Sequence, residues 1–375
     1  MTTKIRVAVL FGGRSSEHSV SCVTARGVLS AIDTDRYEVV PVGITRQGAY
    51  VLAGDEVREY HFDSGNMPEV VDNGTRVLWP DSADDHELRV TEGGATRSLG
   101  VVDIVFPILH GPFGEDGTIQ GMLELVSLPY VGSGVLASSL GMDKHFAKTV
   151  IAQAGIAVAP WRTVTDLDWA KRPDTVRAVV TQLGLPVFVK PARAGSSVGV
   201  TKVKTVTDLD AAMTAALAED NRVLIEATVT GREIECAVLQ DRPGAPTRAS
   251  VAGEIVVSGR EFYDFDAKYL DAPGIDLVCP ADLTADELAE LQRLSVRAFE
   301  AIGGSGLARV DFFMTDAPAD GAGAITPSRF VLNEINTMPG FTPISMFPRC
   351  WSESGLAYPD LIDELIQVAL AHRGR

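Results

Sequence analysis

The sequence is short of cysteine, histidine and basic residues. Its 375 residues include 4 cysteines and 6 histidines, and 33 lysines and arginines face 50 aspartates and glutamates, for a net charge of −17. The cysteines are far apart and form no C-x-x-C pair, which argues against a disulfide framework or zinc site and favours a reducing cytoplasm. Because nucleic acids and anionic membranes are themselves negative, the charge argues against either as the main partner.

Long apolar runs are also absent. No uninterrupted stretch approaches the roughly 20 residues that span a bilayer. The N-terminus lacks the apolar region and small-residue cleavage site of a signal peptide, so we predict a first buried strand there. With 46% hydrophobic and 22% charged residues, the composition is that of a soluble globular protein, and the length suits two or three domains.

The first part of the chain has the pattern of a parallel α/β domain. A buried strand at 4–11, a Gly-Gly turn, a helix at 17–32 with serines near its start as cap candidates, and a strand at 37–44 form a βαβ unit. The other elements expected here are surface strands and loops over 50–98, a strand at 101–109, a helix at 118–127 and a short strand at 128–132. We expect this domain to close near residue 135.

The rest of the chain mixes helices with antiparallel strands. Before residue 227 we expect a helix at 135–154, a strand at 186–191, a flexible loop at 194–200, a helix at 205–219 and a strand at 223–226. After it we expect strands at 233–240 and 250–257, an irregular loop at 259–277, a helix at 284–302, two apolar strands and a closing helix at 358–372. The fold class is therefore α/β, with α+β character in the C-terminal part.

Three oxygen-bearing side chains on the two apolar strands predict a metal site. Glu334 and Asn336 are two residues apart and share a strand face, and Asp311 can join them if the strands are neighbours. Carboxylate and amide oxygens without His or Cys suit Mg²⁺, which usually also binds nucleotide phosphates. Solvated strand-end carboxylates are the alternative, but these lie inside apolar runs, where an unpaired charge is costly.

Basic and Gly-rich segments suggest a phosphate site. Lys190 ends an apolar strand before a loop in which Gly195 and Gly199 can approach an anion and Ser196 and Ser197 can donate hydrogen bonds. The loop is not a Walker A motif, and an ordinary Gly-Ser hairpin is the alternative. Lys144 could be a second phosphate ligand or a surface lysine.

Several other charged residues each allow two interpretations. Glu226 and Glu233 could bind adenine and ribose or could be solvated, and Arg309 could stabilise an oxyanion or transferring phosphoryl group, pair with Glu334, or do both. Glu17, at the start of the first helix, could bind an ammonium or simply favour the helix N-terminus. His110, at the same sheet edge, is modestly favoured as a site residue. A Rossmann dehydrogenase is disfavoured because G-x-G-x-x-G is absent.

Six segments together resemble the D-alanine–D-alanine ligase family of the ATP-grasp superfamily. They occur in the family's order over nearly the whole chain: FGGRSSEHSVS, LHGPFGEDG, GMDK, VKPARAGSSVG, FYDFDAKY and NEINTMPGFT. The resemblance implies an N-terminal α/β substrate-binding domain (1–135), a small ATP-grasp lobe (136–227) and a large lobe with the metal site (228–375). It also implies a cytoplasmic homodimer that makes D-alanyl-D-alanine for peptidoglycan from two D-alanine molecules and ATP, through an acyl phosphate.

The resemblance assigns roles to residues at matching positions. Two Mg²⁺ ions, or Mn²⁺ in their place, would be held by Asp311, Glu334 and Asn336. ATP would contact Lys144, Lys190, Ser196, Ser197, Glu226, Glu233, Phe262, Lys268, Phe313 and Asn333. The substrates would contact Glu17, His110, Tyr269, Arg309, Ser345 and the Met346 N–H, and catalysis would use Glu17, Ser196, Tyr269, Arg309 and the Gly340 N–H.

The resemblance leaves the second substrate and some details open. The Ala-Lys-Tyr of the loop at 262–276 resembles the alanine-using enzymes, which disfavours a D-alanine–D-lactate ligase. Another ATP-grasp carboxylate–amine ligase and a non-catalytic nucleotide sensor are the alternatives, although a sensor would be expected to have lost a metal ligand or phosphate lysine. Ala194 and residues 227–229 depart from many relatives near the nucleotide. A requirement for a monovalent cation such as K⁺ stays undecided.

Overall fold

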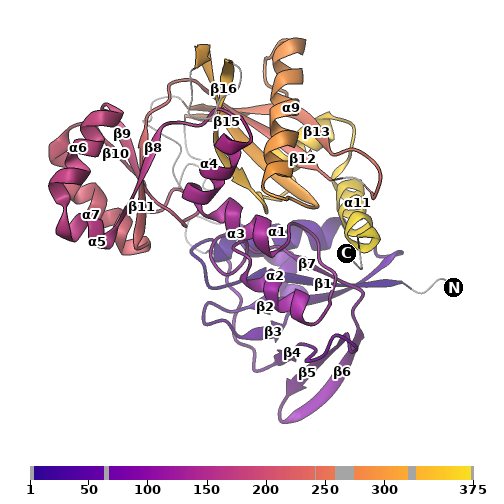
Figure 1. Ribbon diagram of the computed structural model, residues 1–375. Helices are drawn as coiled ribbons and strands as arrows, with labels where there is room; N and C mark the ends of the chain where they lie inside the picture. The colour runs from indigo at the N-terminus through magenta and orange to yellow at the C-terminus, as the bar shows by residue number, and fades with distance from the viewer. Residues whose placement is uncertain (1–3, 63–66, 241, 258–273, 320–326, 373–375) are drawn as a thin grey trace.

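The computed structural model describes residues 4–62, 67–240, 242–257, 274–319 and 327–372. These residues form the mixed α/β arrangement of sheets and covering helices in Figure 1. Phe262, Lys268 and Tyr269 lie outside the described residues, so the roles expected for them stay predictions.

A parallel sheet with one antiparallel edge strand organises the first part of the chain. Its order is β3-β2-β1-β7, formed by Tyr50–Leu52, Tyr37–Ile44, Ile5–Gly12 and Ile104–Pro107. Strand β1 pairs in parallel with β2 and β7, and helix α1 (His18–Ala31) follows β1, so the predicted βαβ unit is confirmed. The predicted serine cap is wrong: Glu17 occupies the N-cap position, and Ser15 Oγ instead accepts the Glu17 N–H at 3.2 Å.

Surface elements complete this part of the chain. A separate sheet of order β4-β5-β6 lies at the bottom of Figure 1. The bounds are Asp55–Glu59 for the 3₁₀ helix η1, Arg76–Leu78 for β4, Glu87–Glu92 for β5, Ala95–Val101 for β6 and Thr118–Leu125 for α2. Strand β7 is shorter than expected because Val101 belongs to β6, and the strand expected at 128–132 makes only the bridge between Tyr130 and Val105.

The helix expected at 135–154 is two helices. Helix α3 (Val135–Met142) ends before Asp143, whose backbone is extended, and α4 (Lys144–Gln153) begins after it. The Asp143 carboxylate accepts hydrogen bonds from the N–H groups of His145 and Phe146, which have no partner within the helix. The single-helix prediction was wrong because apolar periodicity continues through this cap.

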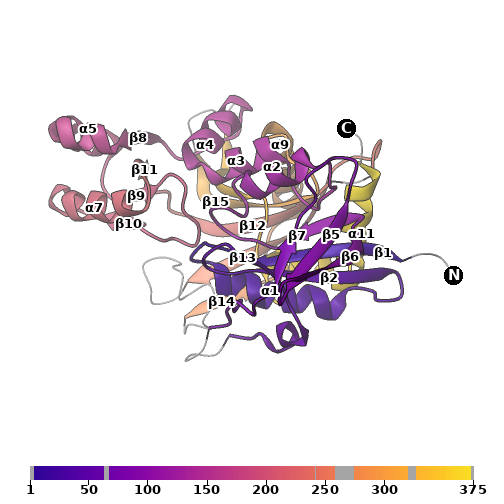
Figure 2. The same cartoon turned by 90° about the horizontal axis from the view of Figure 1, so that it is seen from below.

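Residues 161–227, called the small lobe from here on without α3 and α4 of the range predicted at 136–227, form an antiparallel sheet with helices beside it, at the left of Figures 1 and 2. Its strand order is β10-β9-β11-β8. The strands are Trp161–Thr165 (β8), Val187–Pro191 (β9), Thr201–Val203 (β10) and Arg222–Ala227 (β11). The helices are Asp166–Lys171 (α5), Pro173–Leu183 (α6), Val206–Asp208 (η2) and Leu209–Glu219 (α7). Buried side chains of the sheet, α6 and α7 form one core, which includes Val180, Val189 and Met213.

A five-stranded antiparallel sheet of order β14-β13-β12-β15-β16 carries the rest of the chain. Its strands are Arg232–Leu239 (β12), Arg248–Val257 (β13), Ile275–Val278 (β14), Leu307–Ala319 (β15) and Ser328–Asn336 (β16). Helix α9 (Ala285–Ala301) packs with α4 and the sheet in one core, and α10 (Met346–Glu353) and α11 (Tyr358–Ala371) share another with β1, β7 and α1. The end of the loop expected at 259–277 is strand β14.

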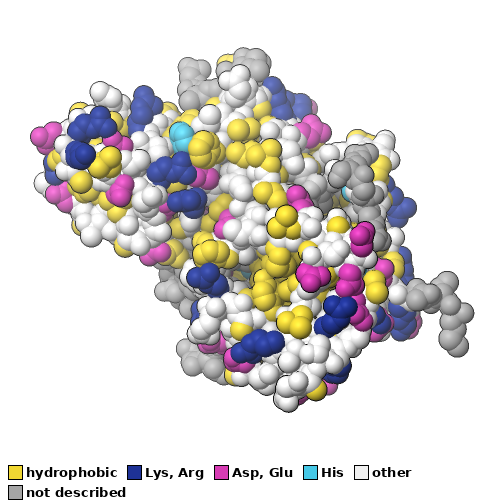
Figure 3. Space-filling view, turned by 60° about the horizontal axis from the view of Figure 1, so that its bottom comes forward, with side chains coloured by type: hydrophobic (Ala, Val, Ile, Leu, Met, Phe, Trp, Pro, Cys, Tyr) yellow, Lys and Arg dark blue, Asp and Glu magenta, His cyan; other side chains and the backbone are white. Residues whose placement is uncertain are grey.

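The surface carries charges of both signs. On the face in Figure 3, basic and acidic side chains are interspersed, including over the small lobe at the left. No helix within the described ranges has both the length and the apolar character needed to cross a membrane. All four cysteines are free, and Cys279 and Cys350 bring their Sγ atoms to 3.6 Å.

Candidate active site

A cavity of about 600 Å³ opens where the first sheet, α4, the small-lobe loop and the large sheet meet. Its wall comes from segments more than 300 residues apart in the sequence. Eleven predicted site residues line it: Glu17, His110, Lys144, Ser196, Arg309, Asn333, Glu334, Asn336, Gly340, Ser345 and Met346. The fold thus brings most of the candidate residues to one chamber.

One corner of the cavity carries buried carboxylate and imidazole groups. Glu17 and His110 are each 5% exposed, and Ser196 Oγ donates a hydrogen bond to Glu17 Oε1. Glu17 Oε2 is buried and has no hydrogen-bond partner within the described part of the chain. A Cβ atom on Gly195 would lie 2.4 Å from Glu17 Oε2, so only glycine allows the loop to approach so closely. A buried, incompletely bonded carboxylate suits a cationic ligand.

His110 is held in this corner as a neutral ring. Its Nδ1 atom lies 3.1 Å from the carbonyl oxygen of Met338, which fixes the ring against the segment after β16. Burial lowers the pKa of His110, against the opposing effect of Glu17. A neutral imidazole here can donate or accept a hydrogen bond without adding charge.

Glu115 belongs to the same corner, and the sequence reasoning gave it no role. It lines the cavity, and Glu115 Oε1 accepts a hydrogen bond from the Gly111 N–H at 2.8 Å. Burial, and then the nearby charge of Glu17, raise the pKa of Glu115 to about 8. The sequence did offer a signal for Glu115. It lies five residues after His110 in the segment LHGPFGEDG, so both side chains belong to one Gly-rich turn.

The two apolar strands are neighbours, as the metal hypothesis requires. Strands β15 and β16 pair Asp311 with Glu334 and Arg309 with Asn336, and directly opposed residues of an antiparallel pair share a face. Asn336 Nδ2 donates to Asp311 Oδ2 at 2.9 Å. A bulge between Asp311 and Phe312 leaves Asn333 as the extra residue of β16, at the cavity wall.

The donor set on β15 and β16 fits Mg²⁺, although only Glu334 and Asn336 line the cavity and Asp311, paired with Glu334, does not. Within the described part of the chain, no three His, Cys, Asp or Glu side chains gather in a metal-holding group. The predicted set has two carboxylates and one amide, so it needs further oxygen ligands. Mg²⁺ bound by one or two carboxylates commonly takes those oxygens from water and substrate phosphates.

Arg309 is fixed between two carboxylates. Its Nε and Nη2 atoms each donate to Asp311 at 2.8 Å, and Nη2 lies 3.2 Å from Glu235 on β12. Burial opposes the positive charge, but Asp311 and Glu235 outweigh it and raise the pKa of Arg309. The sequence had suggested Glu334 as a possible ion-pair partner of Arg309. Its bidentate partner is instead Asp311, although the charge of Glu334 also helps to raise the pKa of Arg309. The sequence reasoning missed Glu235.

The phosphate-site lysines are arranged around the start of α4 and the small-lobe sheet. Lys144 Nζ donates to the carbonyl oxygen of Ala194 at 2.7 Å. Lys190 Nζ donates to Glu226 Oε2 at 2.5 Å, and Lys148, which the sequence reasoning did not select, pairs with Glu226 Oε1. Glu226 is therefore the partner of two lysines.

The remaining predicted nucleotide contacts lie beside this cluster or beyond it. Glu233 of β12 pairs with Phe313 of β15, and β15 lies between β12 and β16 in the sheet. Ser197, like Ser196, has a positive φ (59° and 48°), which a non-glycine residue adopts at some cost. Glu226, Glu233, Lys190, Ser197 and Phe313 do not line the cavity itself.

Another part of the cavity wall is the start of helix α10. Ser345 is the N-cap residue of α10, and its Oγ lies 2.7 Å from Thr342 Oγ1. The Met346 N–H is one of the first N–H groups of this helix, which lack intrahelical partners. Such a terminus favours an anionic group. Gly340, between this helix and β16, also lines the cavity.

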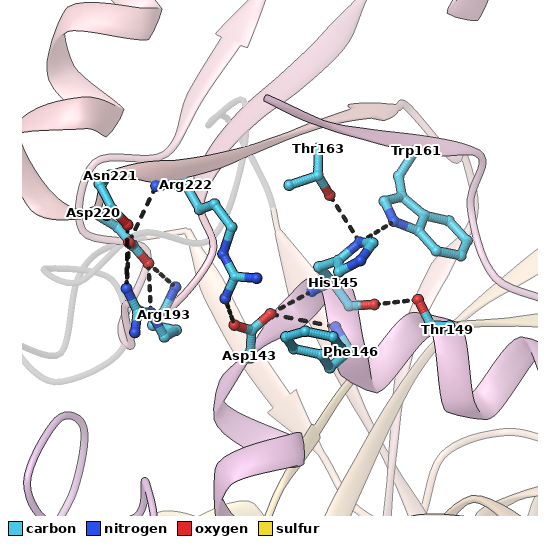
Figure 4. A network of polar contacts seen from close by, with 10 residues as sticks. All are labelled: Asp143, His145, Phe146, Thr149, Trp161, Thr163, Arg193, Asp220, Asn221 and Arg222. Carbon is cyan, nitrogen blue, oxygen red and sulfur yellow. Dashed lines mark hydrogen bonds and ion pairs between the residues drawn. The ribbon is translucent and has the colours of Figure 1, made fainter. Parts of the chain in front are cut away.

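A polar network fixes the start of α4 against the small lobe (Figure 4). Asp143 pairs with Arg222 of β11 while it caps α4. Two residues after Asp143, the Nδ1 atom of His145 lies 2.8 Å from Thr163 Oγ1 of β8. Lys144 lies between these two anchors, so the small lobe sets its position.

Comparisons with known proteins agree over almost the whole chain. Family models described as D-ala D-ala ligase N-terminus and D-ala D-ala ligase C-terminus match residues 6–133 and 150–367. The D-alanine–D-alanine ligase of Paenarthrobacter aurescens is 52% identical and covers 100% of this chain and 97% of its own. That of Streptomyces coelicolor is 48% identical and covers 97% and 93%.

Solved structures give the same result. The VanG D-Ala:D-Ser ligase from Enterococcus faecalis has a TM-score of 0.81 at 34% identity and covers 98% of this chain and 100% of its own. The D-alanine–D-alanine ligase from Coxiella burnetii has a TM-score of 0.78 at 33% identity and covers 99% and 95%.

Proposed function

The chain belongs to the D-alanine–D-alanine ligase family, and we propose that it joins two D-alanine molecules into D-alanyl-D-alanine for peptidoglycan synthesis, converting ATP to ADP and phosphate. The observation that carries the proposal is the charge pattern of one cavity. Glu17 at one corner suits an ammonium, Arg309 and the oxygen ligands suit reacting phosphoryl and carboxyl groups, and the α10 terminus suits a carboxylate. Two amino acids bound head to tail need groups of these kinds: an anion for an ammonium, and cations or N–H groups for carboxyl oxygens.

The reaction would run through an acyl phosphate. A free carboxylate is a poor electrophile, so its oxygen attacks the terminal phosphorus of ATP and ADP leaves. The amine of the second D-alanine then attacks the carbonyl carbon, and the tetrahedral intermediate expels phosphate as the amine loses a proton. Holding both substrates in one chamber removes much of the entropic barrier to this second step.

Cavity residues would divide the work between the two substrates. Glu17, oriented by Ser196, would hold the first ammonium, and His110 would lie near the first carboxylate. Arg309 and the Gly340 N–H would stabilise the oxyanion of the tetrahedral intermediate. Tyr269, which lies outside the described residues, would act together with Glu17 and Ser196 on the first ammonium.

The second substrate would bind at the part of the cavity formed by the start of α10. Its carboxylate would take hydrogen bonds from Ser345 and the Met346 N–H at the α10 terminus. A carboxylate there points the amine back toward the first substrate. Ser345 and Glu17 therefore set the direction of the dipeptide.

The nucleotide would lie between the small lobe and the large sheet. Lys144, Lys190, Lys268, Ser196 and Ser197 would contact the phosphates. Adenine and ribose would contact the remaining predicted residues, namely Glu226, Glu233, Phe262, Phe313 and Asn333. Asp311, Glu334 and Asn336 would hold Mg²⁺, which when bound neutralises phosphate charge. Mn²⁺, which also prefers oxygen ligands, would be able to take the place of Mg²⁺ at this site.

The remaining expectations belong to the same proposal. We place the boundaries of an N-terminal substrate domain and two ATP-grasp lobes at 1–135, 136–227 and 228–375, in a cytoplasmic homodimer associating through the first domain. Leu125 of α2 and Leu136 of α3, 83% and 69% exposed, support an apolar contact surface near that domain. Sedimentation at several concentrations should give twice the mass of the chain, and a monomer at all of them would contradict the dimer.

The test of the function is ADP release with four second substrates assayed in parallel. With D-alanine as first substrate, D-alanine should also be the preferred second one, ahead of D-serine, D-lactate and L-alanine. D-Serine is included because a D-Ala:D-Ser ligase shares 34% of its sequence with this chain. A preference for D-serine or D-lactate would mean that this compound, rather than D-alanine, is the second substrate. If no ADP were released with any of the four compounds, ligase activity would be refuted.

A further inference from the structure

Glu226 is enclosed by two cations from different parts of the fold. Its side chain is 4% exposed, Lys190 reaches it from β9, and Lys148 reaches it from α4. Lys190 and Glu226 share a sheet face because Glu226 pairs with Phe188, two residues before Lys190. Lys148 comes from one helical turn after Lys144 and is 3% exposed. The three groups form a buried triad, Lys148–Glu226–Lys190.

With two lysines around one carboxylate, the triad has a net positive charge. Burial raises the pKa of Glu226, but the two lysines outweigh it and bring that pKa down to about 2, so the carboxylate stays ionised. One cation is enough to pair one carboxylate, and the two cations repel each other across it. An anion that draws one lysine away would relieve that repulsion.

The two lysines respond differently to the shared partner. Burial lowers the pKa of Lys148 despite the attraction of Glu226, with the charge of Lys190 adding to the decrease. For Lys190, Glu226 and other carboxylates outweigh burial, and the pKa is raised. Lys190 is also more exposed, at 16%, and directly precedes the segment that leads to the Ser196 loop. Lys190 is therefore the cation better placed to change partners.

We propose that Lys148 is a positioning residue for nucleotide binding, which keeps Glu226 charged and in place when Lys190 turns from Glu226 to the nucleotide phosphates. The inference rests on the proposed ATP site. Without Lys148, Glu226 would either hold Lys190 back from the phosphates or lose its only remaining cation when Lys190 leaves. Both consequences weaken nucleotide binding, and neither touches the D-alanine corner of the cavity.

The experiment measures ADP binding by calorimetry and the KM values for ATP and D-alanine in Lys148→Met, Lys148→Arg and Glu226→Gln. Lys148→Met should weaken ADP binding and raise the ATP KM by about tenfold or more, because truncating one partner of a buried charge pair is costly. The D-alanine KM should change less than about twofold, because the charge pair that is truncated is not in the D-alanine corner of the cavity. Lys148→Arg should restore most of the affinity.

A double-mutant cycle tests whether Lys148 acts through Glu226. In the Glu226→Gln background, Lys148→Met should change ADP affinity little further, because the carboxylate it positions is gone. Lys171→Met, the same substitution at an exposed lysine of α5, should behave as wild type. Should Lys148→Met fail to fold, Lys148→Gln carries the same expectation, since it removes the charge and keeps a donor.

Three results would overturn the proposal: additive effects in the cycle, no rescue by Lys148→Arg, or equal changes in the KM of ATP and D-alanine. The last would indicate a general structural role for a buried ion pair. ADP binding separates this proposal from the proposed function. If the wild-type protein binds ADP but ligates no D-alanine, the function fails while the cycle still decides the role of Lys148.

Discussion

Replacing Asp311 by Asn should damage both stability and turnover, because this carboxylate is the partner of Arg309 and an expected ligand of Mg²⁺. The Asp311 side chain is 3% exposed and that of Arg309 is 15% exposed, so the pair is shielded from water. Asn keeps the size of the side chain and one acceptor oxygen but removes the charge. Glu235, at 3.2 Å, would remain as an ionised contact of Arg309, and Glu334 would still favour its charge.

The structure sets the size of the stability loss. Removing one partner of a buried ion pair costs about 3–5 kcal/mol, and the retained oxygen and Glu235 reduce this to about 2 kcal/mol. With an unfolding entropy of about 2 cal/mol/K per residue, such a loss lowers the Tm of a chain of this length by about 2–3 °C. Turnover should fall about 100-fold or more, because metal charge stabilisation is worth several kcal/mol.

Thermal melting and ADP release measure the two effects separately. Asp316→Asn is the matched control, since it makes the same change on the same strand at an exposed position, and it should melt and turn over like the wild type. An Asp311→Asn variant with the wild-type Tm would refute the ion-pair reasoning. Wild-type turnover in that variant would refute the metal reasoning, whatever its Tm.

Three other substitutions test other carboxylates of the cavity, one beside Asp311 and two in the corner of His110. Glu334→Gln should nearly abolish ADP release while the protein stays folded by circular dichroism; undiminished release would contradict its place at the metal. Glu17→Gln should chiefly raise the KM of the first D-alanine, and unchanged KM values for both alanines would count against it. Glu115→Gln should remove a pH dependence: with a folded-state pKa of about 8 against 4.5, the native protein binds the extra proton, so stability falls as pH rises between those values. Urea midpoints of wild type and variant that run parallel from pH 5 to 9 would refute this.

The elements that the sequence predicted well are those with a strong local pattern. Strand β2 spans Tyr37–Ile44 as expected, because its alternation and apolar content belong to one uninterrupted buried strand. The pairing of Asp311 with Glu334 was a conditional prediction, since period two sets the face of each strand but not which strands are neighbours. Because both strands are apolar, they favour positions next to each other inside one buried sheet.

The errors arose where a local pattern met a longer-range contact. Apolar periodicity runs through Asp143, but this residue pairs with Arg222 of the small lobe and caps a new helix, so one predicted helix became two. The bulge at Asn333 was equally hidden, because an extra residue in one strand depends on the partner strand. Neither partner is visible in a window of sequence.

Two of the residues that sequence reasoning missed, Lys148 and Glu235, share one property: each is a charge whose partner comes from another element. Lys148 is paired with Glu226 across the α4–β11 contact, and Glu235 is paired with Arg309 across two strands. From sequence alone, such a lysine or glutamate is expected on the surface, because unpaired burial would be too costly. Burial became possible only because the fold brings opposite charges together.

This pairing also explains how a chain with a net charge of −17 can hold a local site for a polyanion. Unpaired lysines gathered in a dry cavity would repel each other and lower their own pKa values. Glu226 removes most of that cost, just as Asp311 and Glu235 do for Arg309. Phosphate binding then becomes an exchange of one anionic partner for another, in which the carboxylate left behind must still have a cation. That requirement is the physical reason to expect two lysines, rather than one, around Glu226.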